Sequence, residues 1–135
     1  MNYVEIDGVA YDVLVTQITR QGEIKQSENY GTTLAEGNPE TLDPLGTYIT
    51  HTVTFRRKSG KEAMFDSLWD TLHIPRFYGV PVKIAYNQTT LEYLARFQVA
   101  PQSVRRIDKK NGKTYWNEMV VTIIPTQAQI TPQGV

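Results

Sequence analysis

Hydrophobic and polar positions alternate along several stretches of the chain, most regularly over residues 48–55. Every second residue of that stretch faces the same side, namely Ile49, His51, Val53 and Phe55. Successive side chains of a β-strand point to opposite faces, so the pattern predicts a strand with one buried face. The opposite face carries threonines and a tyrosine, which suit solvent or a neighbouring subunit.

A hairpin is predicted at the start of the chain, where residues 3–6 and 9–19 flank Asp7-Gly8. This dipeptide is typical of a type I′ turn, in which both central residues have a positive φ angle. The apolar residues of the second arm share one face with Ile18 only if a bulge or bend precedes that residue.

Two more strand pairs are predicted in the second half of the chain. Residues 80–86 and 91–97 flank a polar turn, and residues 98–107 and 113–124 are joined by a segment that contains Asn-Gly. Asn-Gly between two strand-like runs is a strong hairpin signal. Pro125 is expected to end the last strand, since proline lacks the N–H that a ladder needs.

One helix is predicted at about residues 60–72. Ser59 and Glu62 have the spacing of a capping box, in which two N–H groups at the helix start are satisfied by side chains. Apolar residues then recur at helical spacing, namely Met64, Phe65, Leu68, Trp69 and Leu72. This stripe, including Trp69, is expected to pack on the buried face of the strand at 48–55.

The stretch 25–47 has no periodic pattern and few large apolar side chains, so it is predicted to be a long loop. The fold class is therefore mainly β: a β-sandwich or open barrel of six to eight antiparallel strands with one flanking helix. We expect one domain over residues 1–126 and a C-terminal tail over 127–135, where no pattern continues.

Composition narrows the class of protein. The chain has 135 residues, of which 34 are Leu, Ile, Val or Phe, enough for one domain with its own core. No apolar run approaches the ~20 residues that span a bilayer, so no membrane insertion is expected. The first residues lack the basic and apolar regions of a signal peptide. The chain contains no cysteine, which excludes disulfides and thiolate metal sites.

Charge is divided unevenly along the chain, although the net charge is zero. Residues 1–47 hold eight acidic and two basic residues, and residues 48–135 hold six acidic and twelve basic residues. Either the two halves pair within one fold, or acidic and basic surfaces of different copies meet. A balanced net charge argues against a dedicated nucleic-acid binder.

Candidate chemistry is sparse, so no enzymatic activity is expected. No serine lies in a nucleophile elbow, and neither histidine has metal-ligand spacing. Glu62, Asp66 and Asp70 lie along one helical row, which indicates a solvated face rather than an acid/base or cation site. No phosphate-binding glycine motif is present. We therefore predict no catalytic residue, no cofactor, no metal and no small-molecule substrate.

Two features remain as candidate binding surfaces. Basic residues surround the Asn-Gly turn, namely Arg105, Arg106, Lys109, Lys110 and Lys113. They form a solvated hairpin tip, a protein-docking surface or, least favoured, a nucleic-acid contact without sequence specificity. Trp116 begins a strand, where an indole is half buried or offers a platform for a sugar.

One family resemblance depends most on Asp43-Pro44-Leu45-Gly46-Thr47-Tyr48. The supporting segments are Gly31-Thr32-Thr33-Leu34, Thr52-Val53-Thr54-Phe55, Asp66-x-x-Trp69-Asp70-x-Leu72, Ala85-Tyr86-Asn87-Gln88, Tyr115-Trp116 and Val121-Thr122-Ile123-Ile124-Pro125. With these segments the chain resembles, over roughly residues 3–126, small prophage tail proteins of Gram-positive hosts. This resemblance implies a structural protein of the tail tube or baseplate, made in the bacterial cytoplasm and located in the virion. Many such proteins assemble into rings, and a long loop often reaches a neighbouring subunit.

These observations lead to one functional hypothesis and one alternative. The chain is expected to act in a phage tail or baseplate by associating with copies of itself and with adjacent tail proteins. The predicted interface comprises Glu28, Leu34, Glu36, Glu40, Leu42, Asp43 and Leu45 of the loop, with Arg105, Arg106, Lys109, Lys110 and Lys113 of the hairpin. The alternative is a carbohydrate-binding β-sandwich module for host attachment.

Overall fold

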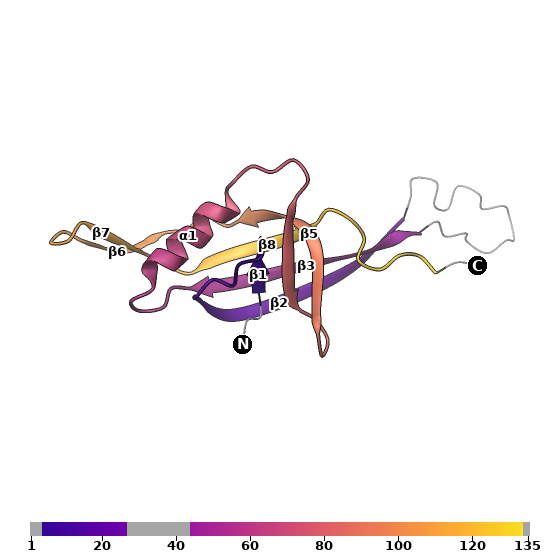
Figure 1. The fold of residues 1–135 in the computed structure, drawn as a ribbon, viewed down its shortest axis with the longest axis horizontal. Coiled ribbons are helices and arrows are strands. Elements are labelled where there is room, and N and C mark those ends of the chain that lie inside the picture. The colour runs from indigo at the N-terminus through magenta and orange to yellow at the C-terminus, as the bar shows by residue number, and fades with distance from the viewer. Residues whose placement is uncertain (1–3, 27–43, 134–135) are drawn as a thin grey trace, which may run out of the picture.

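The computed structural model describes residues 4–26 and 44–133 of the chain. Its single helix in those ranges is α1 (Glu62–Leu72). The strands are β1 (Val4–Ile6), β2 (Leu14–Gln26), β3 (Pro44–Arg56), β4 (Val80–Ala85), β5 (Thr90–Val99), β6 (Val104–Asp108), β7 (Lys113–Trp116) and β8 (Met119–Pro125). The predicted class is confirmed: the fold is mainly β and antiparallel, with one helix (Figure 1).

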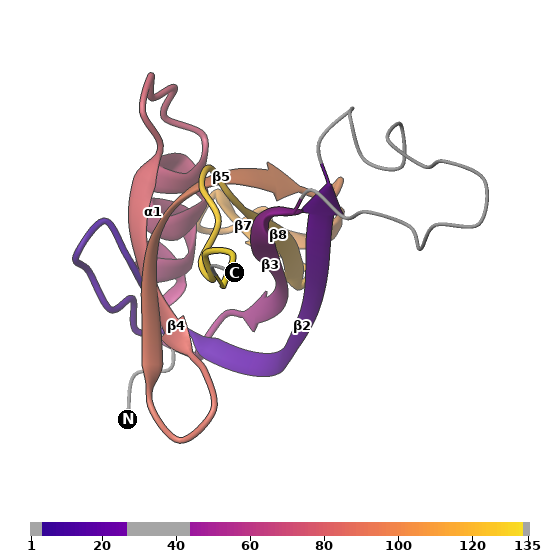
Figure 2. The ribbon, with the colours of Figure 1, turned by 90° about the vertical axis from the view of Figure 1, so that its right-hand side faces the viewer.

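Six strands form one antiparallel sheet in the order β1-β4-β5-β8-β3-β2, and β6 and β7 form a separate two-stranded sheet. Seen from one end, the large sheet is strongly curved (Figure 2). The curvature brings edge strand β2 toward the β4–β5 turn, where the Arg20 guanidinium donates to Asn87 Oδ1 at 2.8 Å. Arg20 also lies over the Tyr86 ring, 5.2 Å from its centroid.

The core lies between α1 and the buried face of this sheet. Ile49, His51, Val53 and Phe55 of β3 are buried, which confirms the predicted alternation. Phe65, Leu68 and Leu72 of α1 belong to the same apolar cluster as Val53 and Phe55. Neighbouring strands complete that cluster with Val82, Ile84, Ala95, Met119, Val121 and Ile123.

The bulge predicted before Ile18 is present. The pairing of β2 with β3 shifts between Val15 and Gln17, so that Thr16 is the extra residue. Val15 and Ile18 are both half-buried against the core as a result. One inserted residue thus keeps apolar side chains on the inner face across a change of register.

The first hairpin is shorter than predicted. Asp7 and Gly8 have φ angles of 54° and 78°, as a type I′ turn requires. After the turn only Val9 pairs, in an isolated bridge with Ile6, and the next strand starts at Leu14. The expected loop is also shorter, because Lys25, Gln26 and residues 44–47 belong to the paired strands β2 and β3.

The predicted pair 98–107 and 113–124 is divided. The first strand stops at Val99, before Pro101, and the second is interrupted at residues 117–118. The proline cannot donate to a ladder, so the chain leaves the large sheet and forms the separate β6–β7 hairpin. Beyond the interruption, β8 rejoins the large sheet between β5 and β3 and ends at Pro125, as expected.

The predicted capping box is wrong. The N-cap of α1 is Lys61, and no side chain caps it. Gly60 has a φ angle of +80° and forms a turn that separates Ser59 from the helix. The Glu62 carboxylate accepts from the Gly60 N–H at 3.4 Å instead. The turn therefore places Ser59 two residues too early for the box geometry, since the N-cap is Lys61.

The prediction that Trp69 belongs to the core is also wrong, since this side chain is 39% exposed. Its position on α1 lies at the border of the buried stripe formed by Phe65, Leu68 and Leu72. The indole stacks on His73, with ring centroids 3.7 Å apart, and it faces a surface groove.

Residues 126–133 form no strand, but they are hydrogen-bonded to β3. The Thr47 N–H donates to Ile130 O at 2.8 Å, and the Gln129 N–H donates to Thr47 O at 2.9 Å. The Ile49 N–H donates to Gln129 Oε1 at 2.6 Å. The segment therefore pairs with the part of β3 that β8 does not reach.

The core prediction is tested at Leu68, which is fully buried between α1 and the sheet. Leu68→Ala removes apolar contacts and leaves a cavity, so we expect the free energy of unfolding to fall by about 2–5 kcal/mol. Phe77→Ala is the control, because Phe77 is fully exposed, and should change the free energy by less than about 0.5 kcal/mol. Urea unfolding measures both; equal stability of the two variants would contradict the described packing.

The docking of the C-terminal segment is tested at Gly46. A Cβ atom there would lie 2.6 Å from Ala128 Cβ and 2.9 Å from Ile130 O, at a φ angle of +132°. Gly46→Ala should therefore destabilise the protein by about 1–3 kcal/mol and speed amide exchange at Thr47 and Gln129. Gly60→Ala is the control, since it adds strain without a close contact; protection of both amides in Gly46→Ala would refute the docking.

Candidate functional site

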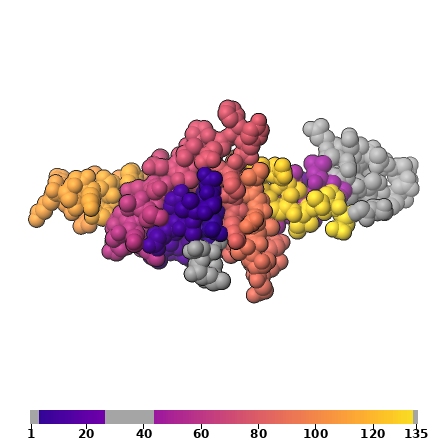
Figure 3. Space-filling model, viewed as in Figure 1, coloured from indigo at the N-terminus to yellow at the C-terminus, as the bar shows by residue number. Residues whose placement is uncertain are grey.

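The β6–β7 hairpin projects from one end of the molecule (Figures 1 and 3). Its tip is held by local hydrogen bonds: the Gly112 N–H donates to Asp108 O at 2.8 Å, and the Lys110 N–H donates to Asp108 Oδ1 at 3.0 Å. The Lys113 N–H donates to Asn111 Oδ1 at 2.9 Å. These bonds shape a tight turn that presents its side chains to solvent.

The structure brings the five predicted basic residues together on this hairpin, and all five are exposed. Arg106 lies over the Tyr115 ring at 4.5 Å from its centroid. Within the part of the chain that the structure describes, Arg105, Lys109 and Lys110 form no ion pair. Ile107 is also 60% exposed on the same hairpin. The hairpin thus carries unpaired cations and an uncovered apolar side chain.

Most of the loop residues predicted to form the other side of the interface lie outside the described residues. This applies to Glu28, Leu34, Glu36, Glu40, Leu42 and Asp43. Leu45 is described: it is 51% exposed in β3, near Ile24 of β2, which is 64% exposed. This end of the β2–β3 pair is at the opposite end of the molecule from the basic hairpin (Figure 1).

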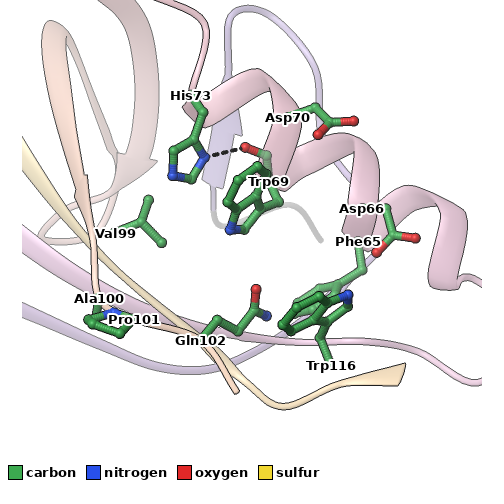
Figure 4. Close-up of a pocket in the computed structure, with 10 residues that line it drawn as sticks. All are labelled: Phe65, Asp66, Trp69, Asp70, His73, Val99, Ala100, Pro101, Gln102 and Trp116. Carbon is green, nitrogen blue, oxygen red and sulfur yellow. Dashed lines mark hydrogen bonds between the residues drawn. The ribbon is translucent and has the colours of Figure 1, made fainter. Parts of the chain in front are cut away.

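Sequence reasoning missed a groove that lies between α1 and the base of the hairpin (Figure 4). Its volume is about 450 Å³. Trp69 enters from α1 and Trp116 from β7, with Gln102 between them in this view. The other lining residues are Phe65, Asp66, Asp70, His73, Val99, Ala100 and Pro101. Each tryptophan was visible in the sequence, but only the break at residues 100–103 brings the two together.

The floor of the groove is fixed by hydrogen bonds around that break. The Gln102 side-chain Nε2 donates to Asn117 O at 2.8 Å, and the Asn117 N–H donates to Ser103 O at 3.0 Å. This bond uses one of the two N–H groups of the Gln102 amide, which leaves the second N–H as a donor and Oε1 as an acceptor.

The polar atoms that line the groove are mostly acceptors. His73 Nδ1 lies 2.6 Å from Trp69 O, which can only accept, so Nδ1 carries the proton and Nε2 of the neutral ring is an acceptor. Asp66 and Asp70 add two carboxylates, and neither forms an ion pair within the described ranges. Burial raises the pKa of Asp66, and the nearby carboxylates of Asp70 and Glu62 add to this shift.

His51 is a structural residue of the core, as its place on the apolar face of β3 predicted. Its Nδ1 lies 2.8 Å from the Tyr93 hydroxyl, and its Nε2 is buried without a partner among the described residues. Burial, with the charge of Arg20 as a smaller cause, lowers the pKa of His51 to about 4. Burial also raises the pKa of Tyr93, so its hydroxyl keeps its proton.

Within residues 4–26 and 44–133, no group of three or more histidine, aspartate or glutamate side chains is arranged to hold a metal ion. No helix in the same ranges is long and apolar enough to cross a membrane. Comparisons with protein-family models, curated proteins and solved structures found no match to the chain. The features of the molecule that bear on its function are therefore its two ends and the groove.

The buried His51 makes stability depend on pH. Its pKa is about 4 in the folded protein and 6.5 in the unfolded chain, so the unfolded state binds more protons between these values. Stability is therefore complete above pH 6.5 and should fall by about 3 kcal/mol as pH drops to 4. Urea unfolding across pH 7 to 4 measures this loss.

His51→Gln is the matched variant, because glutamine keeps a polar partner for Tyr93 but does not titrate. Its stability should be much less sensitive to pH in the same window. Asp12 does not account for the effect, since hydrogen bonding from Lys58 lowers its pKa below the usual value and moves its titration to more acidic pH. An identical pH dependence in both proteins would refute the assignment to His51.

Proposed function

We propose that the protein is a structural component of a bacteriophage or prophage-derived tail or baseplate, acting by self-association and by contact with other tail proteins. The observation that carries this proposal is the pair of extensions at opposite ends of the molecule, the β6–β7 hairpin and the β2–β3 pair. The side chains of an extension that contributes little to its own core can be buried by contact with another subunit. The resemblance of the sequence to small prophage tail proteins supports the same class.

Exposed apolar side chains support a role in assembly. Ile24 and Leu45 are uncovered on the β2–β3 pair, and Val104 and Ile107 are uncovered on the hairpin. Single exposed apolar residues are normal, but here they lie on both projecting elements. Such side chains would anchor a contact once a partner excludes water from them.

Charge supports a head-to-tail arrangement. The sequence that joins β2 to β3, residues 27–43, contains four acidic residues and no basic residue. The hairpin at the other end carries five basic residues and one acidic residue. Opposite charges on two ends orient copies and speed their encounter, and a contact between unlike surfaces repeats into a ring or a stack.

The proposal is tested by replacing residues 27–43 with Asn-Gly. Gln26 and Pro44 lie directly opposite each other in the ladder, so a two-residue type I′ turn can join them. The shortened protein should melt within a few degrees of the full chain, since the sequence of the segment contains few large apolar side chains. Its self-association should also become weaker, measured by light scattering and by electron microscopy at low salt.

The control is a loop of the same length in which the four acidic residues are replaced by their amides. If charge drives the contact, this control is also defective; if the apolar anchors dominate, it associates more weakly but still forms the same particles. A shortened protein that assembles like the full chain would contradict the role assigned to the loop. A full chain that neither self-associates nor enters tail particles would contradict the proposed function.

A further inference from the structure

The groove between α1 and the base of the hairpin points to a partner of defined chemistry. We propose that this groove binds cationic side chains from the tip of the β6–β7 hairpin of a second copy of the chain. The inference rests on the proposed function, because it names one of the surfaces through which copies would associate.

The chemistry of the lining favours a cation. Its polar side-chain atoms include the carboxylates of Asp66 and Asp70, and the acceptors Gln102 Oε1 and His73 Nε2. None of the described residues that line it is a lysine or an arginine. Ammonium and guanidinium groups have only donors and, unlike a neutral sugar, can neutralise the two carboxylates; the donors in the lining are the two indole N–H groups and the second N–H of Gln102.

The aromatic walls favour the same ligand. Trp69 and Trp116 line the groove on two sides, and indole is the aromatic ring that attracts cations most strongly. Trp69 is stacked on His73, which fixes its ring at the groove edge. Two indoles and two carboxylates thus surround a space of about 450 Å³, which is large enough for several side-chain groups.

The hairpin of another copy has the matching features. Lys109 and Lys110, at the tip, are exposed and form no ion pair within the described part of the chain. The tip points away from α1 of its own chain, so it does not reach its own groove (Figure 1). A five-residue strand spans roughly 16 Å, so the hairpin can extend well beyond the body of one molecule.

Each copy would then offer one hairpin and one groove. Because the two surfaces differ, the contact is heterologous, and its repetition gives a closed ring or an open chain. The hairpin tip is also the basic surface that the proposed function sets against residues 27–43 of another copy, so both contacts depend on the same cations. Rising salt would weaken the groove–hairpin contact, since exposed charges are screened beyond about 10 Å at 0.1 M.

The test uses two variants of the full chain. The groove variant is Trp69→Leu with Asp70→Asn, which keeps an apolar side chain on α1 but removes the indole and one charge. The hairpin variant is Lys109→Gln with Lys110→Gln, which alters the tip and leaves the base beside the groove unchanged. The control is Phe77→Leu with Glu92→Gln, which alters an exposed aromatic residue and an exposed acid outside the groove.

Sedimentation velocity at low salt should show self-association of the wild-type chain and of the control. The groove and hairpin variants should each associate at least about tenfold more weakly, the ratio that corresponds to 1.4 kcal/mol. Thermal melts establish that all four proteins are folded.

Mixing the two defective variants gives the sharpest result. The groove variant still has its hairpin and the hairpin variant still has its groove, so together they should form a 1:1 complex of about twice the 15.4 kDa mass. This complex cannot extend through further groove–hairpin contacts, because the remaining groove and hairpin are the altered ones. The only two tryptophans of the chain line the groove, so intrinsic fluorescence of the hairpin variant should change on mixing.

The outcomes separate this inference from the proposed function. If the groove variant associates like the wild type while the shortened loop weakens association, the groove does not bind the hairpin and the proposed function stands. If the mixture remains monomeric, the inference is also overturned. If neutral oligosaccharides quench the tryptophans and arginine amide does not, the groove is a sugar site. A wild-type chain that stays monomeric and never enters tail particles would refute both.

Discussion

The burial of one face of the six-stranded sheet beneath α1 is the interaction on which the rest of the structure depends. Phe65, Leu68 and Leu72 cover the apolar residues of β3 and β8, and no other helix is available in the described residues to do so. The position of α1 also defines one wall of the groove, through Trp69. Packing of the core and the shape of the surface therefore have a common origin in one eleven-residue helix.

Local patterns in the sequence predicted the elements whose residues follow a strict period. The alternation in β3, the bulge before Ile18 and the apolar stripe of α1 were all readable, because each reflects burial of one face. The ends of strands that are set by pairing with residues distant in sequence could not be predicted. Nothing local shows that Lys25 and Pro44 continue a ladder, or that Gln129 pairs with the start of β3.

The candidate site was predictable only in part, for the same physical reason. The basic hairpin is contiguous in sequence, so its charges could be recognised together. The groove combines residues from α1, from the 99–102 segment and from β7, which are brought together by the large sheet. A signal did exist in Pro101, which interrupts an otherwise strand-like run. Trp69 was assigned to the core because helical spacing does not distinguish the centre of an apolar stripe from its border.

The place of β8 in the sheet has a consequence for how the chain folds. This strand, Met119–Pro125, is the next to last described segment, yet it lies in the centre of the sheet between β5 and β3. The β1–β4 and β2–β3 pairs cannot join into one sheet until it is present. During synthesis, the residues up to Pro125 must leave the ribosome before the core closes, so folding is dominated by contacts between distant residues and should be slow.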